Sequence, residues 1–161
     1  MELTTGLEIN LARVGNKTTC PVSALINKGR ILLGLRHYAA QSVWTCPGGR
    51  CETNESIESA LKREIVEETG IQELTFIAYI GEVVGANKGD IVPFFLSTTH
   101  KDPILMEPKK FSEWRWVKLV DFLNGNPKDY INELTRQALK AFMEANPHCL
   151  NSILTEKPAS R

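Results

Sequence analysis

Three glutamates, Glu64, Glu67 and Glu68, follow one another at helical spacing in the most acidic part of the chain. A helix places residues three and four positions apart side by side, with about 5–6 Å between their Cβ atoms. Three carboxylates so close together repel one another and stay partly protonated unless a counter-charge is present. Mg²⁺ and Mn²⁺ prefer carboxylate oxygen and water as ligands. The spacing therefore indicates a site for a hard divalent cation.

The helix that would carry these carboxylates is predicted from about Glu55 to Thr69, with Gly70 as its C-cap. On a wheel of about 100° per residue, its core-facing positions are Ile57, Ala60, Leu61 and Ile65. The three glutamates fall in the same sector. A glutamate-rich helix usually presents a solvated face, but here that face is held by Glu58, Ser59 and Lys62. We therefore expect all three carboxylates to point inward.

The overall composition is that of a single folded domain. The chain has 161 residues, of which 42% are apolar, with 19 basic and 19 acidic side chains. This composition argues against a disordered chain. The zero net charge argues against a protein that holds nucleic acid through a broad basic face. The charges are uneven, however, because residues 50–73 contain 3 basic and 7 acidic side chains.

Features of membrane, secreted or zinc-binding proteins are absent from the sequence. No run approaches the roughly 18 apolar residues that span a bilayer, and the N-terminus does not resemble a signal peptide. The three histidines are scattered. The four cysteines include no CxxC pair, although Cys46 and Cys51 could form a ligand or redox pair. We favour reduced cysteines and predict a cytoplasmic protein.

The remaining pattern predicts strands mixed with two helices, and hence an α/β sandwich. The expected strands are residues 21–26, 30–36, 43–46, 73–84, 91–97 and 114–117. A turn is expected at residues 27–29, an edge or irregular position at Pro93, and a second helix over residues 127–145. The predicted organisation is an N-terminal extension (1–19), one domain (20–147) and a tail (148–161) with little core potential.

The segment from Gly49 to Ile71 matches the pattern GX5EX7REUXEEXGU, where U is a bulky apolar residue, at all nine specified positions. This pattern is the Nudix box, and the chain resembles the Nudix hydrolase family. The stretches Leu32–Arg36 and Cys46–Gly49 resemble the family's usual approach to the box. Glu107-Pro108 followed by Glu113–Val117 resembles the late loop and strand of MutT-type nucleoside triphosphate pyrophosphohydrolases. The resemblance covers about residues 20–145. It implies the Nudix fold, a mixed central β-sheet sandwiched between α-helices. Cys46 departs from the bulky apolar residue usual at its position.

The resemblance also implies roles for the residues of the box. Glu64, Glu67 and Glu68 would coordinate Mg²⁺, with Mn²⁺ as an alternative, and Glu64 or its neighbour would help to deprotonate the attacking water. Arg63 would orient the glutamates. Glu55 would brace Arg63 or reach a metal ion through water.

Other positions are candidates for structural or substrate contacts. The glycines Gly48 and Gly49 would allow a sharp turn into the helix, with Gly48 also at the substrate. Glu107 is a candidate fourth carboxylate, with an ordinary loop acid as the alternative. Arg36 is a candidate phosphate or base contact or else a solvated strand end. Trp44 and Phe95 would stack on a base or belong to the core.

The expected substrate is a small-molecule nucleotide, without nucleic acid or membrane partners. The ADP-ribose branch has Pro where this chain has Ala86, and the diadenosine polyphosphate branch has Tyr near residues 87–89. We therefore expect hydrolysis of a nucleoside triphosphate, such as an oxidised dNTP like 8-oxo-dGTP, to monophosphate and pyrophosphate. The alternatives are dihydroneopterin triphosphate, a nucleotide sugar, or nucleotide binding without turnover. The complete box favours an enzyme. A homodimer is left open.

Overall fold

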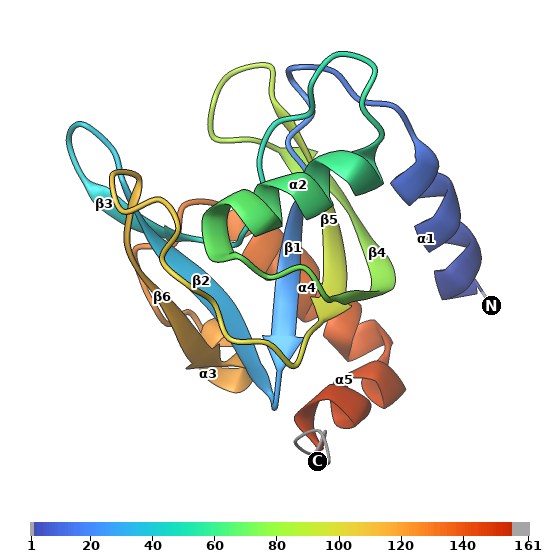
Figure 1. Ribbon diagram of the computed structural model, residues 1–161. Helices are drawn as coiled ribbons and strands as arrows, with labels where there is room; N and C mark the ends of the chain where they lie inside the picture. The colour runs from blue at the N-terminus through green and yellow to red at the C-terminus, as the bar shows by residue number, and fades with distance from the viewer. Residues whose placement is uncertain (1, 156–161) are drawn as a thin grey trace.

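The structure is a computed structural model and describes residues 2–155 of the chain (Figure 1). The strands are β1 (Val22–Asn27), β2 (Arg30–His37), β3 (Ser42–Thr45), β4 (Thr75–Val84), β5 (Ile91–Thr98) and β6 (Phe111–Lys118). The helices are α1 (Glu2–Ala12), α2 (Ile57–Thr69), α3 (Leu119–Leu123), α4 (Glu133–Ala145) and α5 (Pro147–Leu154). No helix among these residues combines the length and apolar character needed to cross a membrane.

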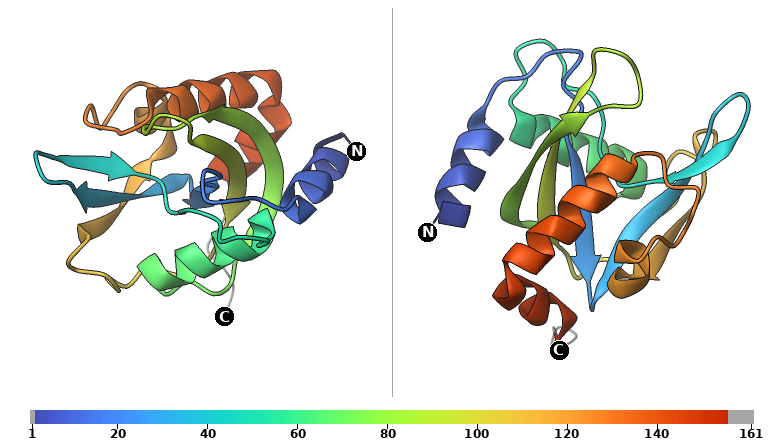
Figure 2. Two further views of the ribbon diagram at one scale, coloured as in Figure 1. Left: turned by 90° about the horizontal axis from the view of Figure 1, so that it is seen from above. Right: turned by 180° about the vertical axis from the view of Figure 1, so that it is seen from behind.

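The six strands form one mixed sheet in the order β3-β2-β1-β5-β4, with β6 paired to β2 beside this path. The strands β1 and β5 are parallel, and the other paired strands are antiparallel. Figure 2 shows α2 on one side of the sheet and α4 with α5 on the other, while α1 lies beside β4. The predicted α/β fold with a sheet between helices is confirmed.

The turn between β1 and β2 forms where it was predicted. Lys28 and Gly29 have φ values of 55° and 75°, the left-handed pair of a two-residue hairpin. The prediction for Pro93 is half right. Pro93 pairs with Glu82 in the interior strand β5, and the register of β4 shifts just before this pair. The edge alternative is therefore wrong, and the irregular pairing, between Tyr79 and Gly81, lies near Pro93.

Two hydrophobic clusters hold the layers together. The cluster between the sheet and α2 includes Leu25, Leu32, Phe95, Leu61 and Ile65, each 0% exposed. Burying each such side chain contributes about 1.5–3 kcal/mol. The other cluster joins the sheet to α3, α4 and α5. These two clusters fix which sides of α2 and α4 face the sheet.

The chain ends contribute more to the core than predicted. Ile153 of α5 is 5% exposed and belongs to the cluster beneath α4, so the expectation of little core potential after residue 147 is wrong. At the other end, α1 buries Leu7 and Leu11 against the α2 side of the sheet. The boundaries predicted at residues 19 and 147 stay predictions.

The second predicted helix begins later than expected. α4 starts at Glu133 because the side chain of Asn132 accepts a hydrogen bond from Leu134 N at 3.0 Å and caps the helix. Residues 127–132 are therefore outside the helix. The start also turns Leu134 outward, to 45% exposed, and Arg136 inward, to 3%.

Candidate active site

A glycine turn packs the start of the box against β1. Gly49 N donates to Pro21 O at 3.1 Å, and Ser23 N donates to Pro47 O at 3.0 Å. A Cβ atom on Gly48 would overlap Pro21 O, and one on Gly49 would overlap the carboxyl group of Glu64. Both positions therefore need glycine, the second because a site carboxylate lies directly on its backbone.

Helix α2 has the C-cap and the buried stripe that the sequence predicted, and it begins at Ile57 after an N-cap, Ser56, that was not predicted. The Ser56 hydroxyl accepts a hydrogen bond from Ser59 N at 3.1 Å, and Gly70 ends the helix with φ of 74°. The four predicted core-facing residues, Ile57, Ala60, Leu61 and Ile65, are each 0% exposed. This stripe fixes the rotation of the helix about its axis, and with it the direction of the glutamates.

The three glutamates are not equivalent. Glu68 is 3% exposed, and its Oε1 accepts a hydrogen bond from Gly48 N at 3.1 Å. The side chain of Glu64 is 15% exposed, whereas that of Glu67 is 49% exposed. The expectation that all three point inward is wrong for Glu67. Glu67 lies at the edge of the inward sector, where the helix surface meets solvent.

Burial shifts the proton affinity of two of these carboxyl groups. Loss of hydration is the main cause that raises the pKa of Glu68 to about 8; the charges of Glu64 and Glu107 act in the same direction, and Gly48 N–H and Lys110 oppose them. Burial likewise raises the pKa of Glu64 above its ordinary range. The protein thus holds poorly hydrated carboxyl groups without enough positive charge to compensate them.

Arg63 lies among four acceptors within the box. Its guanidinium donates to both carboxylate oxygens of Glu55, at 2.8 and 2.9 Å, and to Arg50 O at 3.1 Å. Its Nη1 lies 3.2 Å from Glu64 Oε2 and 3.5 Å from Glu67 Oε1. These bonds hold the pKa of Glu55 below its usual range. The arrangement agrees with the expected bracing by Glu55, although the roles in catalysis stay predictions.

Glu107 lies in the loop before β6, close enough to Glu68 to affect its pKa. Its Oε1 is buried without a hydrogen bond, and Lys110 Nζ forms an ion pair with it at 3.5 Å. A loop acid of the ordinary kind would be hydrated. The buried, under-bonded oxygen is consistent with a ligand position beside the box.

Glu64 and Glu68 face a cavity of about 390 Å³. Three cationic side chains also line it, namely Arg36, Arg50 and Lys110. Two aromatic rings, those of Tyr38 and Phe111, lie 5.1 and 5.5 Å from the guanidinium carbon of Arg36. The remaining walls come from the loop between β4 and β5 and from the segment before α4. The cavity thus brings a negative and a positive group of side chains together.

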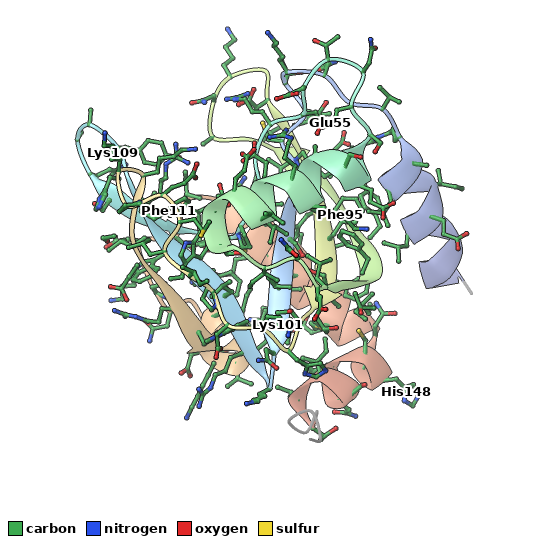
Figure 3. All side chains as sticks on the ribbon, in the orientation of Figure 1. Glu55, Phe95, Lys101, Lys109, Phe111 and His148 are labelled. Atoms are coloured by element: carbon green, nitrogen blue, oxygen red, sulfur yellow. The ribbon has the colours of Figure 1, made fainter. Side chains whose placement is uncertain are left out.

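The structure places two of the four predicted substrate contacts at the cavity and two outside it. Arg36 and Gly48 line the cavity, and the buried Nε of Arg36 has no hydrogen-bond partner. Phe95 is 0% exposed in the core beneath α2 and cannot stack on a base (Figure 3). Trp44 also lies outside the cavity lining, packed on the other core cluster, with the guanidinium carbon of Arg115 4.8 Å from its ring centre. For Phe95 the core alternative is the correct one, whereas Trp44 is partly buried and its role stays a prediction.

Several cavity residues were missed by sequence reasoning. Arg50 occupies a variable position of the box, and Asp90, Lys110, Tyr130 and Asn132 lie in loops or at an element boundary, without periodicity. Figure 3 shows Phe111 and Glu55 near opposite ends of α2. The box thus supplies one part of the cavity wall, and distant segments supply the rest.

Comparison with known proteins identifies the family. A model of the NUDIX domain matches residues 19–141. The chain belongs to the Nudix family. It is a Nudix hydrolase, and members of this family generally act on nucleotide substrates with a divalent metal ion such as Mg²⁺.

Curated relatives of this Nudix chain carry several names. An NAD-capped RNA hydrolase NudC from Photobacterium profundum is 26% identical over 82% of this chain, which spans about half of that protein (49%). An RNA pyrophosphohydrolase from Wolbachia pipientis is 27% identical over 76% of this chain and 87% of that one. An 8-oxo-dGTP diphosphatase from Buchnera aphidicola is 34% identical over 48% and 62% of the two chains.

Solved structures include MutT-type relatives. A MutT NUDIX hydrolase from Burkholderia pseudomallei is 28% identical, with a TM-score of 0.60 over 76% of this chain and 95% of that one. The dihydroneopterin triphosphate pyrophosphohydrolase of E. coli shares the fold at 16% identity, with a TM-score of 0.64 over 83% and 99% of the two chains.

The carboxylates of the box have the chemistry that a divalent ion needs. Glu64 and Glu68 are under-hydrated oxygen donors, and Glu107 adds a buried oxygen without a hydrogen bond. Within residues 2–155, however, no three Asp, Glu, His or Cys side chains stand together as a ready-made metal site. Arg63 holds Glu64 and Glu67 instead. The donor set fits a hard cation, and binding would draw the carboxylates away from Arg63.

Proposed function

We propose that this Nudix hydrolase cleaves a nucleoside triphosphate to a nucleoside monophosphate and pyrophosphate with the help of Mg²⁺. The observation that carries the proposal is the cavity in which Glu64 and Glu68 face the same space as Arg36, Arg50 and Lys110. A polyphosphate together with divalent ions needs both groups, carboxylates for the ions and cations for the phosphate oxygens.

The carboxylates of α2 act at the reacting phosphate. Glu64, Glu67 and Glu68 would hold the metal ion, with Glu107 as a fourth ligand. When bound, the ion acidifies water and offsets charge on the phosphates. Glu64 accepts the proton of the attacking water, and burial, by raising its pKa, makes it a stronger base than an ordinary glutamate.

The cations bind the phosphates that leave as pyrophosphate. Arg36 presents a buried Nε–H without a partner, and the rings of Tyr38 and Phe111 hold its guanidinium in place. Lys110 lies beside them and already forms an ion pair with Glu107. A phosphate oxygen would satisfy the unpaired donor of Arg36.

The size of the cavity favours a single nucleotide. A volume of about 390 Å³ lies within the usual range for small-molecule sites. The side chains Asn87, Tyr130 and Asn132 line it with polar atoms that could bond a base. We therefore propose a small-molecule nucleotide in a cytoplasmic setting, with an oxidised dNTP or dihydroneopterin triphosphate among the candidates.

The names of the relatives favour a second candidate. Two of the curated relatives described above are named for activities on RNA ends. The same active site could remove pyrophosphate from the 5′-triphosphate end of an RNA, because the bond cleaved is the same. In that case the first nucleotide of the RNA would occupy the cavity, and the rest of the RNA would extend out of it.

A panel of substrates tests both candidates. The protein with Mg²⁺ is incubated with canonical dNTPs, 8-oxo-dGTP, dihydroneopterin triphosphate, a nucleotide sugar and a 5′-triphosphate RNA. Pyrophosphate, inorganic phosphate and nucleoside monophosphate are measured separately, because a nucleotide sugar would release only the last of these. We expect pyrophosphate from at least one free triphosphate at a higher kcat/KM than from RNA. Faster release from RNA would favour the second candidate. No release from any substrate would overturn the hydrolytic proposal.

A further inference from the structure

Arg50 and Asp90 form a two-bond ion pair at the cavity. Arg50 Nη1 donates to Asp90 Oδ1 at 2.8 Å, and Arg50 Nη2 donates to Asp90 Oδ2 at 2.7 Å. The Asp90 side chain is 9% exposed, and that of Arg50 is 47% exposed. Paired guanidinium and carboxylate groups of this geometry are stronger and more directional than single ion pairs. Both residues line the cavity.

Asp90 anchors the loop between β4 and β5. Its backbone N donates to Asn87 O at 3.1 Å, and its O accepts from Gly85 N at 2.8 Å. The Asp90 carboxylate also accepts a hydrogen bond from the Asn87 side chain, which with Arg50 holds the pKa of Asp90 below its usual range. Gly85, Ala86 and Asn87 themselves line the cavity. Asp90 thus holds the loop through two backbone hydrogen bonds and through its carboxylate.

Residues 85–89 have little else to hold them. None of these five residues is buried, and residues 86–89 are exposed. A loop without buried apolar side chains opens at low free-energy cost unless polar contacts restrain it. Removing the ion pair would therefore loosen this wall of the cavity.

Arg50 in turn is tied to the catalytic helix. Arg63 Nη2 donates to Arg50 O at 3.1 Å, and Arg50 Nη1 donates to Lys17 O at 3.0 Å. The guanidinium of Arg63 also contacts Glu64. A chain of hydrogen bonds therefore runs from the catalytic carboxylates through Arg63 and Arg50 to Asp90 and the loop.

We propose that the Arg50–Asp90 pair is a clamp that fixes residues 85–90 as a wall of the nucleotide site and thereby sets nucleotide affinity. Arg50 and Asp90 are positioning residues in this role, because they act through Gly85, Ala86 and Asn87. The inference rests on the proposed function, since it takes a nucleotide as the ligand of the cavity.

The test compares Asp90→Asn with Arg50→Gln in the full chain. Asp90→Asn breaks the clamp but leaves the Arg50 cation in the cavity, so it separates the clamp from a direct contact between Arg50 and phosphate. The probe is dGTP with a methylene group between its α and β phosphorus atoms, titrated calorimetrically with Mg²⁺. Hydrogen exchange of residues 85–90 is measured on the same samples.

The matched control is the Arg13–Glu82 ion pair, with an N–O distance of 2.6 Å and side-chain exposures of 40% and 35%. It joins the segment after α1 to β4, and neither residue lines the cavity. We expect Asp90→Asn and Arg50→Gln each to raise Kd by about 5- to 20-fold and to speed exchange of residues 85–90. Glu82→Gln should leave the Kd and the exchange rate of residues 85–90 within about twofold of their wild-type values.

Each other result contradicts the clamp. If Arg50→Gln weakens binding and Asp90→Asn does not, Arg50 acts by contacting phosphate. If both variants lower Tm without changing Kd or loop exchange, the pair is only structural. Wild-type protein that does not bind the analogue overturns the inference together with the proposed site. Wild-type protein that binds the analogue but hydrolyses no nucleotide overturns the proposed function alone.

Discussion

The helices α2 and α4 have the same length, 13 residues, and cover opposite faces of one sheet, yet they bury opposite charges in different ways. Each buries one ionisable side chain to 3% exposure, Glu68 on α2 and Arg136 on α4. Glu68 has one hydrogen bond, from Gly48 N. Arg136 donates to Pro127 O, pairs with Glu133 at 3.4 Å and lies against two aromatic rings.

The difference separates a functional charge from a structural one. A buried charge is tolerated when hydrogen bonds and opposite charge replace its lost hydration. Arg136 has such partners within the protein, a carbonyl, a carboxylate and two aromatic rings, although its Nε lacks a hydrogen bond, and it holds the segment before α4. Glu68 lacks a cationic partner of its own, so burial favours its protonated form in metal-free protein, and a bound cation would be needed to compensate its charge. Replacing each charge should therefore have opposite consequences for stability and activity.

The largest effect is expected at Glu64, which shares the cavity with Glu68. Glu64→Gln keeps the shape of the side chain but removes its charge, so kcat should fall by about 10²–10⁴-fold with Tm unchanged or higher. Glu58→Gln on the solvent side of α2, where Glu58 pairs with Lys62 at 2.8 Å, is the control and should keep wild-type kcat. Similar rates for the two variants would contradict the assignment of Glu64.

Removing the paired charge on α4 should act on stability instead. Arg136→Met leaves Glu133 and Pro127 O without their partner and should lower the free energy of unfolding by about 2–3 kcal/mol. Chemical denaturation measures this loss. At a temperature where the variant is folded, kcat should stay within a few fold of wild type. A variant as stable as wild type would contradict the claim that the buried charge on α4 has a structural role, unlike the one on α2.

A smaller effect is expected at the glycine beneath Glu64. Gly49→Ala would place a Cβ atom into the Glu64 carboxyl group and force it aside. We expect kcat to fall by about tenfold, since the displaced carboxylate costs roughly 1.4 kcal/mol of transition-state stabilisation. Gly6→Ala, where a Cβ meets nothing within 4 Å, serves as the control. Equal kcat for both variants would show that the position of Glu64 is not critical.

The last prediction concerns how the free energy of unfolding depends on pH in metal-free protein. Because the pKa of Glu68 is raised to about 8, the folded state holds more protons than the unfolded state between about pH 4.5 and 8. The free energy of unfolding should therefore fall as pH rises through this window, and Glu68→Gln should flatten the dependence. Thermal melts in chelator at several pH values measure it. Parallel curves for the two proteins would contradict the unpaired state of Glu68.

The α2 side of the molecule was largely predictable from sequence. The spacing of Ile57, Ala60, Leu61 and Ile65 determines which face of the helix is buried, and Gly70 marks its end. The carboxylates follow from the same periodicity. Of the three carboxylates only Glu67 was misplaced. A helical wheel gives the direction of a side chain but does not show whether a residue at the edge of the buried side is covered or exposed.

The substrate side was predicted poorly because it is built from long-range contacts. Arg50 and Asp90 are 40 residues apart, and neither has a local pattern that indicates the other. Residues 127–132 read as the start of a helix, and the true start depends on the cap at Asn132. Trp44 and Phe95 illustrate the same limit, since an aromatic side chain does not reveal by its position in the chain whether a core or a cavity receives it.

The most direct test of the account measures activity and stability on one variant. Glu68→Gln is compared with wild type for pyrophosphate release at saturating Mg²⁺, with the best triphosphate of the panel, and for Tm in chelator at pH 8. The account predicts a rate at least about 100-fold lower together with a Tm equal to or above wild type. A variant with wild-type rate, or with a lowered Tm that explains its loss of rate, would contradict it.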